Sequence, residues 1–153
     1  MSDAAPLYLE DLHVGDSFVT DRVVVEEREI IEFGEKYDPQ TFHVDPEAAQ
    51  LSFFGGLVAS GWHTVGMSMR LLVSTVPLAG GFIGAGAQAR WPSATRPGDA
   101  IHVRATVMSI TPPQSKSDRA VVTMECLSLT DDDDVRLELT IRIVVMRRVL
   151  PTR

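Results

Sequence analysis

The chain has 153 residues, of which 44% are hydrophobic and 23% charged, a composition typical of a globular protein. A chain of this length can bury about two-thirds of its unfolded surface, so we expect one domain over residues 1–153. The net charge is −7 and the isoelectric point about 5.0. This acidity argues against nucleic acid or an anionic membrane surface as the main partner.

Cysteine content and the first residues bear on the cellular compartment. Cys126 is the single cysteine, so no internal disulfide can form. A reducing environment suits such a chain, and we expect a cytoplasmic location. The beginning, MSDAAPLYLEDLHVGD, lacks a basic stretch followed by an apolar run, so we expect no signal peptide. The most apolar stretch, 57–73, contains too many polar residues for a membrane span.

The first third of the chain predicts one strand and then short helices. VGDSFVTDRVVV begins with a Gly-Asp turn and continues in β-branched residues, which predicts a strand at about 16–25. EEREIIEFGEKY places apolar residues among charges, as an amphipathic helix does. Pro39 disfavours helical geometry at Asp38, so this helix should end there. DPEAAQ predicts one helical turn, with Asp45 as its N-cap and Pro46 at its first position.

The segment from Val58 to Ser74 predicts one long helix. Apolar residues recur there every three or four positions, and the other faces carry little charge. Such a helix is typically buried, so we expect the rest of the protein to wrap it. The expected apolar stripe consists of Val58, Trp62, Val65, Met69, Leu72 and Val76.

The remainder of the chain predicts an antiparallel sheet. GGFIGAGAQARW is glycine-rich but extended, RPGD is a turn, and three further segments alternate apolar and polar residues. The connections are short and contain no helix, so the strands should be antiparallel. This order predicts an α+β protein, a single hot dog domain whose long central helix is wrapped by a curled sheet. Because a free sheet edge needs a partner, we expect a homodimer or a dimer of dimers.

The stretch YDPQTFHVDPEAA holds Asp38 and His43 five residues apart, outside the predicted helices. One interpretation is structural, with Asp38 and Pro39 in a turn and His43 half-buried. The other is an acid–base pair, because a carboxylate orients an imidazole that titrates near neutral pH. Pro39 would fix the backbone, while Phe42 and the SFFGG segment would exclude water.

Glycines flank the start of the expected long helix in GGLVASGWHT. Gly55, Gly56 and Gly61 could serve close packing alone. Alternatively, the free N–H groups of a first helical turn and the helix dipole could stabilise an oxyanion or a thioester enolate. Glycine would then let a ligand carbonyl approach closely. Together with Asp38 and His43, this would supply a base, an acid and an oxyanion donor.

The other polar candidates are weaker. His13, His63 and His102 show no metal-ligand spacing with one another or with Cys126, so we expect no metal site. His63 could line a pocket, although a helix histidine with satisfied hydrogen bonds is the more common case. DDDD, at 131–134, is expected to be a solvated hairpin turn and not a cation loop.

Two stretches, YDPQTFHVDPEAA and FFGGLVASGWHT, resemble the signature of the MaoC-like dehydratases, which include the (R)-specific enoyl-CoA hydratases. RWPSATRPGDAI also resembles the stretch before their PGD turn, so the resemblance runs from about residue 10 to 148. The family has the hot dog fold. The resemblance implies a hydratase or dehydratase acting on a 2-enoyl or 3-hydroxyacyl thioester, carried by coenzyme A or an acyl carrier protein, without a cofactor.

The resemblance also implies roles for single residues. Asp38 and His43 would bind the catalytic water and shuttle protons, and Gly61 would donate its N–H to the thioester oxygen. The Asp-to-His spacing is that of the family, whereas Gln40 and Thr41 stand where Asn and Pro are usual. The other residues expected to contact the substrate are Ser60, which replaces a histidine before the glycine, and Phe42, Phe54, Gly56 and Trp62.

Two other functions are compatible with the same fold. A hot dog thioesterase would hydrolyse the thioester, but many such enzymes carry a carboxylate on the central helix, and 58–74 contains no Asp or Glu. A non-catalytic acyl-binding subunit would need neither Asp38 nor His43. Basic residues that could contact coenzyme A phosphates, on charge alone, are Arg90, Arg96, Lys116 and Arg119.

Overall fold

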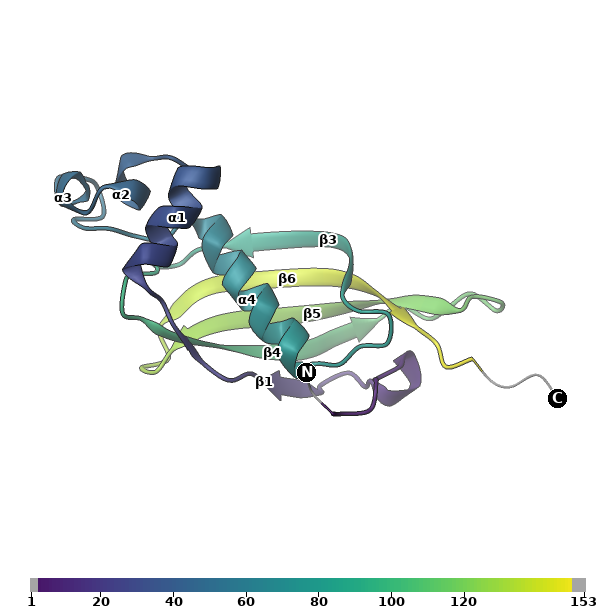
Figure 1. The fold of residues 1–153 in the computed structure, drawn as a ribbon. Helices are drawn as coiled ribbons and strands as arrows, with labels where there is room; N and C mark the ends of the chain where they lie inside the picture. Colours follow the sequence, from purple (N-terminus) through teal and green to yellow (C-terminus); the bar gives the residue numbers. More distant parts are fainter. Residues whose placement is uncertain (1–2, 150–153) are drawn as a thin grey trace.

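The computed structural model describes residues 3–149 and contains a six-stranded antiparallel sheet crossed by one long helix (Figure 1). Two short strands, β1 (Ser17–Val19) and β2 (Val23–Val24), both pair with β4. The strand order β1-β4-β5-β6-β3 leaves β3 at the opposite edge. The four longer strands are β3 (Ile83–Arg90), β4 (Ala100–Ile110), β5 (Arg119–Thr130) and β6 (Val135–Met146).

The helices precede most of the sheet in the chain. A short 3₁₀ turn, η1, spans Leu9–Asp11, and the α-helices are α1 (Glu27–Tyr37), α2 (Thr41–Val44), α3 (Pro46–Ala49) and α4 (Gly61–Thr75). Helix α4 lies across one face of the sheet, and α1, α2 and α3 gather where α4 begins (Figure 1). No helix within residues 3–149 combines the length and the apolar character needed to cross a bilayer.

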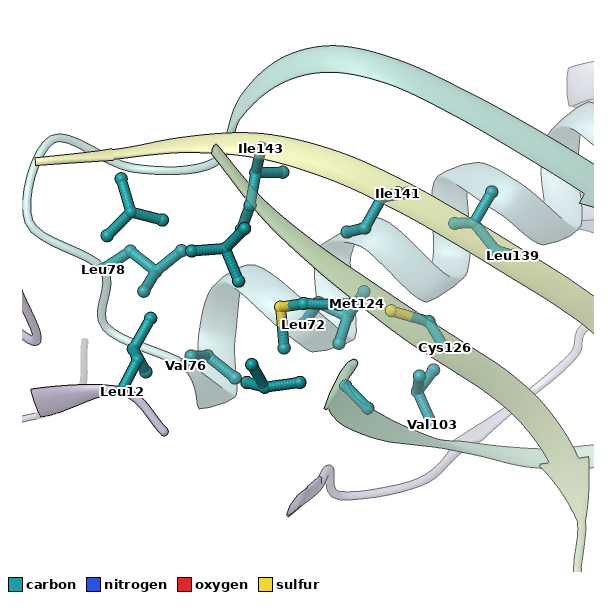
Figure 2. Close-up of a cluster of buried hydrophobic side chains, with 14 of the residues drawn as sticks. Leu12, Leu72, Val76, Leu78, Val103, Met124, Cys126, Leu139, Ile141 and Ile143 are labelled. Carbon is teal, nitrogen blue, oxygen red and sulfur yellow. The ribbon is translucent and has the colours of Figure 1, made fainter. Parts of the chain in front are cut away.

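The main hydrophobic core lies between α4 and the sheet (Figure 2). Alternate residues of β4 face it as predicted, and Val103 and Ala105 are both 0% exposed. Leu72 and Val76 fill the core from the end of α4. Each such aliphatic side chain contributes about 1.5–3 kcal/mol when fully buried, so this layer supplies much of the stability.

Most predicted elements are confirmed, although some of their boundaries differ. The strand expected at 16–25 is divided, because Thr20 hydrogen-bonds Val103 through both its backbone N–H and its hydroxyl, each at 2.9 Å. His43 lies within helix α2 and not on a loop. The turn at 96–99 and the hairpin turn at 131–134 are present. Asp45 caps α3 as expected, accepting the N–H groups of Glu47 and Ala48.

Helix α4 differs from its prediction in the residues that it buries. It begins at Gly61 because Ser60 still has extended backbone, with ψ of 139°. Trp62 is 64% exposed, so the expected apolar stripe is not continuous, and Val73, at 54%, shows that the helix is not buried on all sides. The buried positions of its first half are polar, and their hydroxyl groups find partners on the sheet side. These contacts are Thr64 Oγ1 to Thr95 Oγ1 at 3.0 Å and Ser68 Oγ to Ser128 Oγ at 2.6 Å.

Candidate active site

Asp38, His43 and Ser60 meet just before α4. The Ser60 hydroxyl donates to Asp38 Oδ2 at 2.8 Å, and His43 Nε2 lies 3.3 Å from the same oxygen. Gln40 Nε2 donates to the other carboxylate oxygen, Oδ1, at 2.8 Å. Both oxygens of Asp38 are therefore held by groups from separate parts of the chain, as a site that must keep one geometry requires.

His43 is 5% exposed and oriented at both ring nitrogens. Its Nδ1 lies 2.6 Å from the carbonyl oxygen of Val58, and its Nε2 faces Asp38. Both nitrogens thus face oxygen acceptors, which assigns a proton to Nδ1 and lets Nε2 exchange one with the carboxylate. Gly34 lets α1 pack closely on α2 at His43, since an added Cβ there would lie 3.0 Å from His43 Cβ.

The surroundings of Asp38 favour its ionised form. Burial by itself would raise the pKa of this carboxyl, but hydrogen bonds from Gln40 and Ser60 and the neighbouring His43 together lower the pKa below its ordinary value of 3.8. Asp38 is therefore a carboxylate at neutral pH and can accept a proton or a hydrogen bond from water.

Gly61, the first residue of α4, is needed for close packing against Trp91. Trp91 Nε1 donates to the Gly61 carbonyl oxygen at 3.0 Å, and a Cβ added to Gly61 would lie 2.6 Å from the indole ring. Close packing therefore explains Gly61 but not Gly55, where an added Cβ would meet nothing within 4 Å. The Gly61 N–H has no backbone acceptor within residues 3–149, as is usual for a first helical turn. A ligand oxygen placed there would gain this hydrogen bond and the favourable helix dipole.

A pocket of about 380 Å³ opens beside these groups. Phe42 forms part of its wall and contacts the rings of His43 and Phe54, with centroid distances of 4.6 and 5.1 Å. Two predicted site residues do not line the pocket. Ser60 is fully buried, and Gly56 lies beside Arg96. The predicted site residues that line the pocket are Asp38, His43, Gly61, Phe42, Phe54 and Trp62.

Trp91 and Thr95 also line this pocket, although no motif in the sequence marks them as site residues. Both follow β3, about 30 positions after the start of α4, and only the tertiary fold brings them to the site. No local pattern signals such a contact. Of the basic residues considered for phosphate binding, Arg96 donates to the Phe54 carbonyl at 2.8 Å, and Arg119 pairs with Asp118 at 2.7 Å.

His63 does not behave as the satisfied helix histidine that is the more common case. It is 9% exposed, and its Nδ1 has no hydrogen-bond partner in the part of the chain that the structure describes. Within the same residues, no cluster of three or more His, Cys, Asp or Glu side chains could hold a metal ion. His63 is thus a buried polar residue with an unsatisfied nitrogen. The contacts made by Asp38 and His43 do not explain why it is there.

Comparison with known families identifies the chain. The model of the MaoC like domain matches residues 11–126. The chain belongs to the MaoC-like domain family. A MaoC-like dehydratase from Rhodospirillum rubrum is 52% identical to this MaoC-like protein, with a TM-score of 0.90 over 94% of this chain and 99% of that one. These matches confirm the hot dog fold and place the protein among enzymes of the hydratase and dehydratase kind.

Two further comparisons are weaker, and the first of them concerns a solved structure of low sequence identity. The (R)-hydratase PhaJ1 from Pseudomonas aeruginosa is 17% identical, with a TM-score of 0.75 over 97% of this chain and 93% of that one. At this identity the likeness concerns the fold alone. The uncharacterized protein YdeM from Bacillus subtilis (strain 168) is 35% identical over 65 residues, which span 42% of this chain and 46% of that protein.

Proposed function

We propose that this MaoC-like protein adds water to a 2-enoyl thioester, or removes it from a 3-hydroxyacyl thioester, with Asp38 and His43 as the acid–base pair. The thioester would be carried by coenzyme A or an acyl carrier protein. The observation that carries this proposal is the 3.3 Å approach of His43 Nε2 to Asp38 Oδ2 at the wall of a pocket that Gly61 also lines. A rigid carboxylate–imidazole pair beside a free helix N–H matches what hydration of an enoyl thioester requires.

The proposed reaction begins with water held between Asp38 and His43. Asp38 accepts one proton while the water oxygen bonds to Cβ of the substrate, and the Cα=Cβ electron pair moves toward the thioester carbonyl. The resulting enolate oxygen receives the Gly61 N–H and the helix dipole. Collapse of the enolate takes a proton from His43 Nε2 to Cα, and the proton on Asp38 then returns to His43. The reverse sequence is dehydration.

Ser60 and Gln40 act in this scheme as positioning residues. Each donates one hydrogen bond of 2.8 Å to a different oxygen of Asp38. These bonds stabilise the carboxylate and fix its plane relative to the imidazole. Gln40 thus occupies the place where the family motif carries Asn, and its longer side chain reaches the carboxylate directly.

We also propose a cytoplasmic homodimer formed through β3. Its outer edge pairs with no strand among residues 3–149. Residues 83–89 of this strand are uncharged, and Arg90 is its last residue. An uncharged edge strand of this length is a ready partner for a second copy. Light scattering should give twice the 16.8 kDa mass of one chain. Ala87→Lys, on the exposed strand, should lower this mass, and a monomeric wild type would contradict the proposal.

The function is tested by one assay with two readouts. Purified protein is mixed with trans-2-enoyl-CoA esters of short, long and branched acyl groups, while enoyl absorbance and free thiol are followed together. We expect loss of absorbance without thiol release. Thiol release without hydration would favour a thioesterase, and silence with every ester would favour an acyl-binding subunit. Helix α4 carries no Asp or Glu, which counts against one common thioesterase arrangement.

A further inference from the structure

A second cavity, of about 600 Å³, lies between α1 and α4. Neither Asp38 nor His43 lines it. His63, in the first turn of α4, forms one wall, and its ring stacks on Phe33 of α1 with centroids 4.8 Å apart and planes inclined by 9°. Further along α4, Met67 continues the wall with an apolar surface. The cavity therefore has a long apolar side and one buried imidazole.

The two cavities are lined by consecutive residues in the first turn of α4. Trp62 and Thr64 line the pocket of the candidate active site, while the residue between them, His63, lines the second cavity. Burial lowers the pKa of His63, and His43 makes a smaller electrostatic contribution in the same direction. A substrate held at Asp38 thus lies within a few residues of the second cavity.

His63 lines this cavity and has one buried ring nitrogen without a partner among the described residues. No hydrogen bond is found for its Nδ1 within residues 3–149, and only 9% of the residue is exposed. A buried polar atom without a partner is unfavourable and uncommon, and such an atom requires an explanation. Burial keeps the ring neutral, so it offers one N–H donor and one acceptor nitrogen.

The charged side chains at this cavity leave an excess of positive charge. Arg22 is paired with Asp131 at 2.6 Å, and Glu32 with Arg28 at 3.9 Å. A negatively charged group would therefore be attracted to the cavity. Three charged side chains of the lining make no ion pair within residues 3–149. These are the cations Lys36 and Arg70 and the anion Glu29.

We propose that the second cavity receives the distal part of the acyl group and that His63 hydrogen-bonds a carboxylate carried on it. This inference rests on the proposed function, because it names the acyl class of that same thioester. A purely hydrocarbon tail would leave the imidazole without a partner, whereas a carboxylate oxygen accepts its N–H and attracts Lys36 and Arg70. The apolar wall contacts the methylene groups in between.

The test compares two saturated ligands that cannot be hydrated, hexanoyl-CoA and adipoyl-CoA, which differ in a terminal carboxylate. By calorimetric titration we expect the wild type to bind adipoyl-CoA at least tenfold more tightly. His63→Leu should lose this preference without weaker binding of hexanoyl-CoA. Met67→Leu, a change of similar size on the same wall, should keep it. Equal affinities in the wild type, or a preference that survives His63→Leu, would overturn the inference.

A second variant tests the inference in case His63→Leu folds poorly. Arg70 is exposed, so Arg70→Met should fold normally, weaken adipoyl-CoA binding severalfold and leave hexanoyl-CoA binding unchanged. The trans-2-enoyl forms of the same esters test the proposed function separately. Hydration with no carboxylate preference in binding overturns this inference alone. A carboxylate preference without hydration supports the cavity assignment and contradicts the proposed function.

Discussion

The two halves of α4 bury opposite kinds of side chain. In the first half the buried residues are His63, Thr64 and Ser68, and in the second half Leu72 is 0% exposed within the main core. The first half lines both cavities, whereas the second half reaches the second cavity through Arg70 and Leu71 and packs on the sheet through Leu72. One helix thus combines a polar segment that serves the candidate site with an apolar segment that stabilises the fold, and substitutions should separate the two roles.

The largest effect on turnover should come from Asp38→Asn, beside the polar half. The amide keeps the shape of the side chain but cannot accept a proton, so turnover should fall by about two orders of magnitude or more. The melting temperature should change little. The measurement is loss of enoyl absorbance with the best ester, next to a thermal melt. A folded variant that keeps wild-type turnover would remove Asp38 from the mechanism.

His43→Ala should lower turnover by a similar factor of about 100, because it removes the other acid–base group. It also leaves the Val58 carbonyl without its 2.6 Å contact, so we expect some loss of stability as well. Turnover is therefore compared at a temperature where circular dichroism shows both proteins folded. Full activity in the variant would assign the proton to another group.

Leu72→Ala tests the apolar half. Removal of a fully buried leucine side chain should lower the free energy of unfolding by about 2–5 kcal/mol, measured by urea denaturation. Turnover at low temperature should stay near the wild-type value, since Leu72 lies outside both cavities. A large loss of turnover in the folded variant would show that the two halves are coupled.

Gly61→Ala tests the junction of α4 with the pocket. The added Cβ would lie 2.6 Å from Trp91, so the indole must move, and overpacking of this kind typically costs about 1–3 kcal/mol. Turnover should fall with it. Gly66→Ala is the matched control on the same helix, because a Cβ there meets nothing within 4 Å. That variant should gain about 0.5–1 kcal/mol from helix propensity.

Cys126, in the core beneath α4 (Figure 2), should give the smallest effect. Burial, with a smaller contribution from Glu125, raises the pKa of its thiol to about 12. An unfolded cysteine ionises near pH ~8.5, so the free energy of unfolding should fall as the pH rises from about 8.5 toward 12. Cys126→Ala should remove this slope. The native thiol should also resist Ellman's reagent at pH 8 and react once denatured.

Local sequence patterns predicted the sheet well and the helix faces poorly. The alternation in β4 and β6 places side chains on two faces whatever the tertiary contacts, so these strands were predictable. The polar face of α4 was not predictable, because its partners are distant in the sequence. Thr64 bonds Thr95, 31 positions away, and Ser68 bonds Ser128, 60 positions away. For the site, Asp38 and His43 lie five residues apart in one motif, so the sequence alone predicts them as a pair. Trp91 was not predictable, because only the tertiary fold brings it against Gly61.

The arrangement around Gly61 gives the protein a built-in optical reporter. The chain contains two tryptophans, Trp62 and Trp91, and both line the pocket beside Asp38 and His43. Their rings are 5.4 Å apart at an interplanar angle of 79°. All indole emission therefore arises at the wall of this pocket. An acyl ligand that displaces water there will change the wavelength or intensity of that emission, so binding can be titrated without a label or turnover.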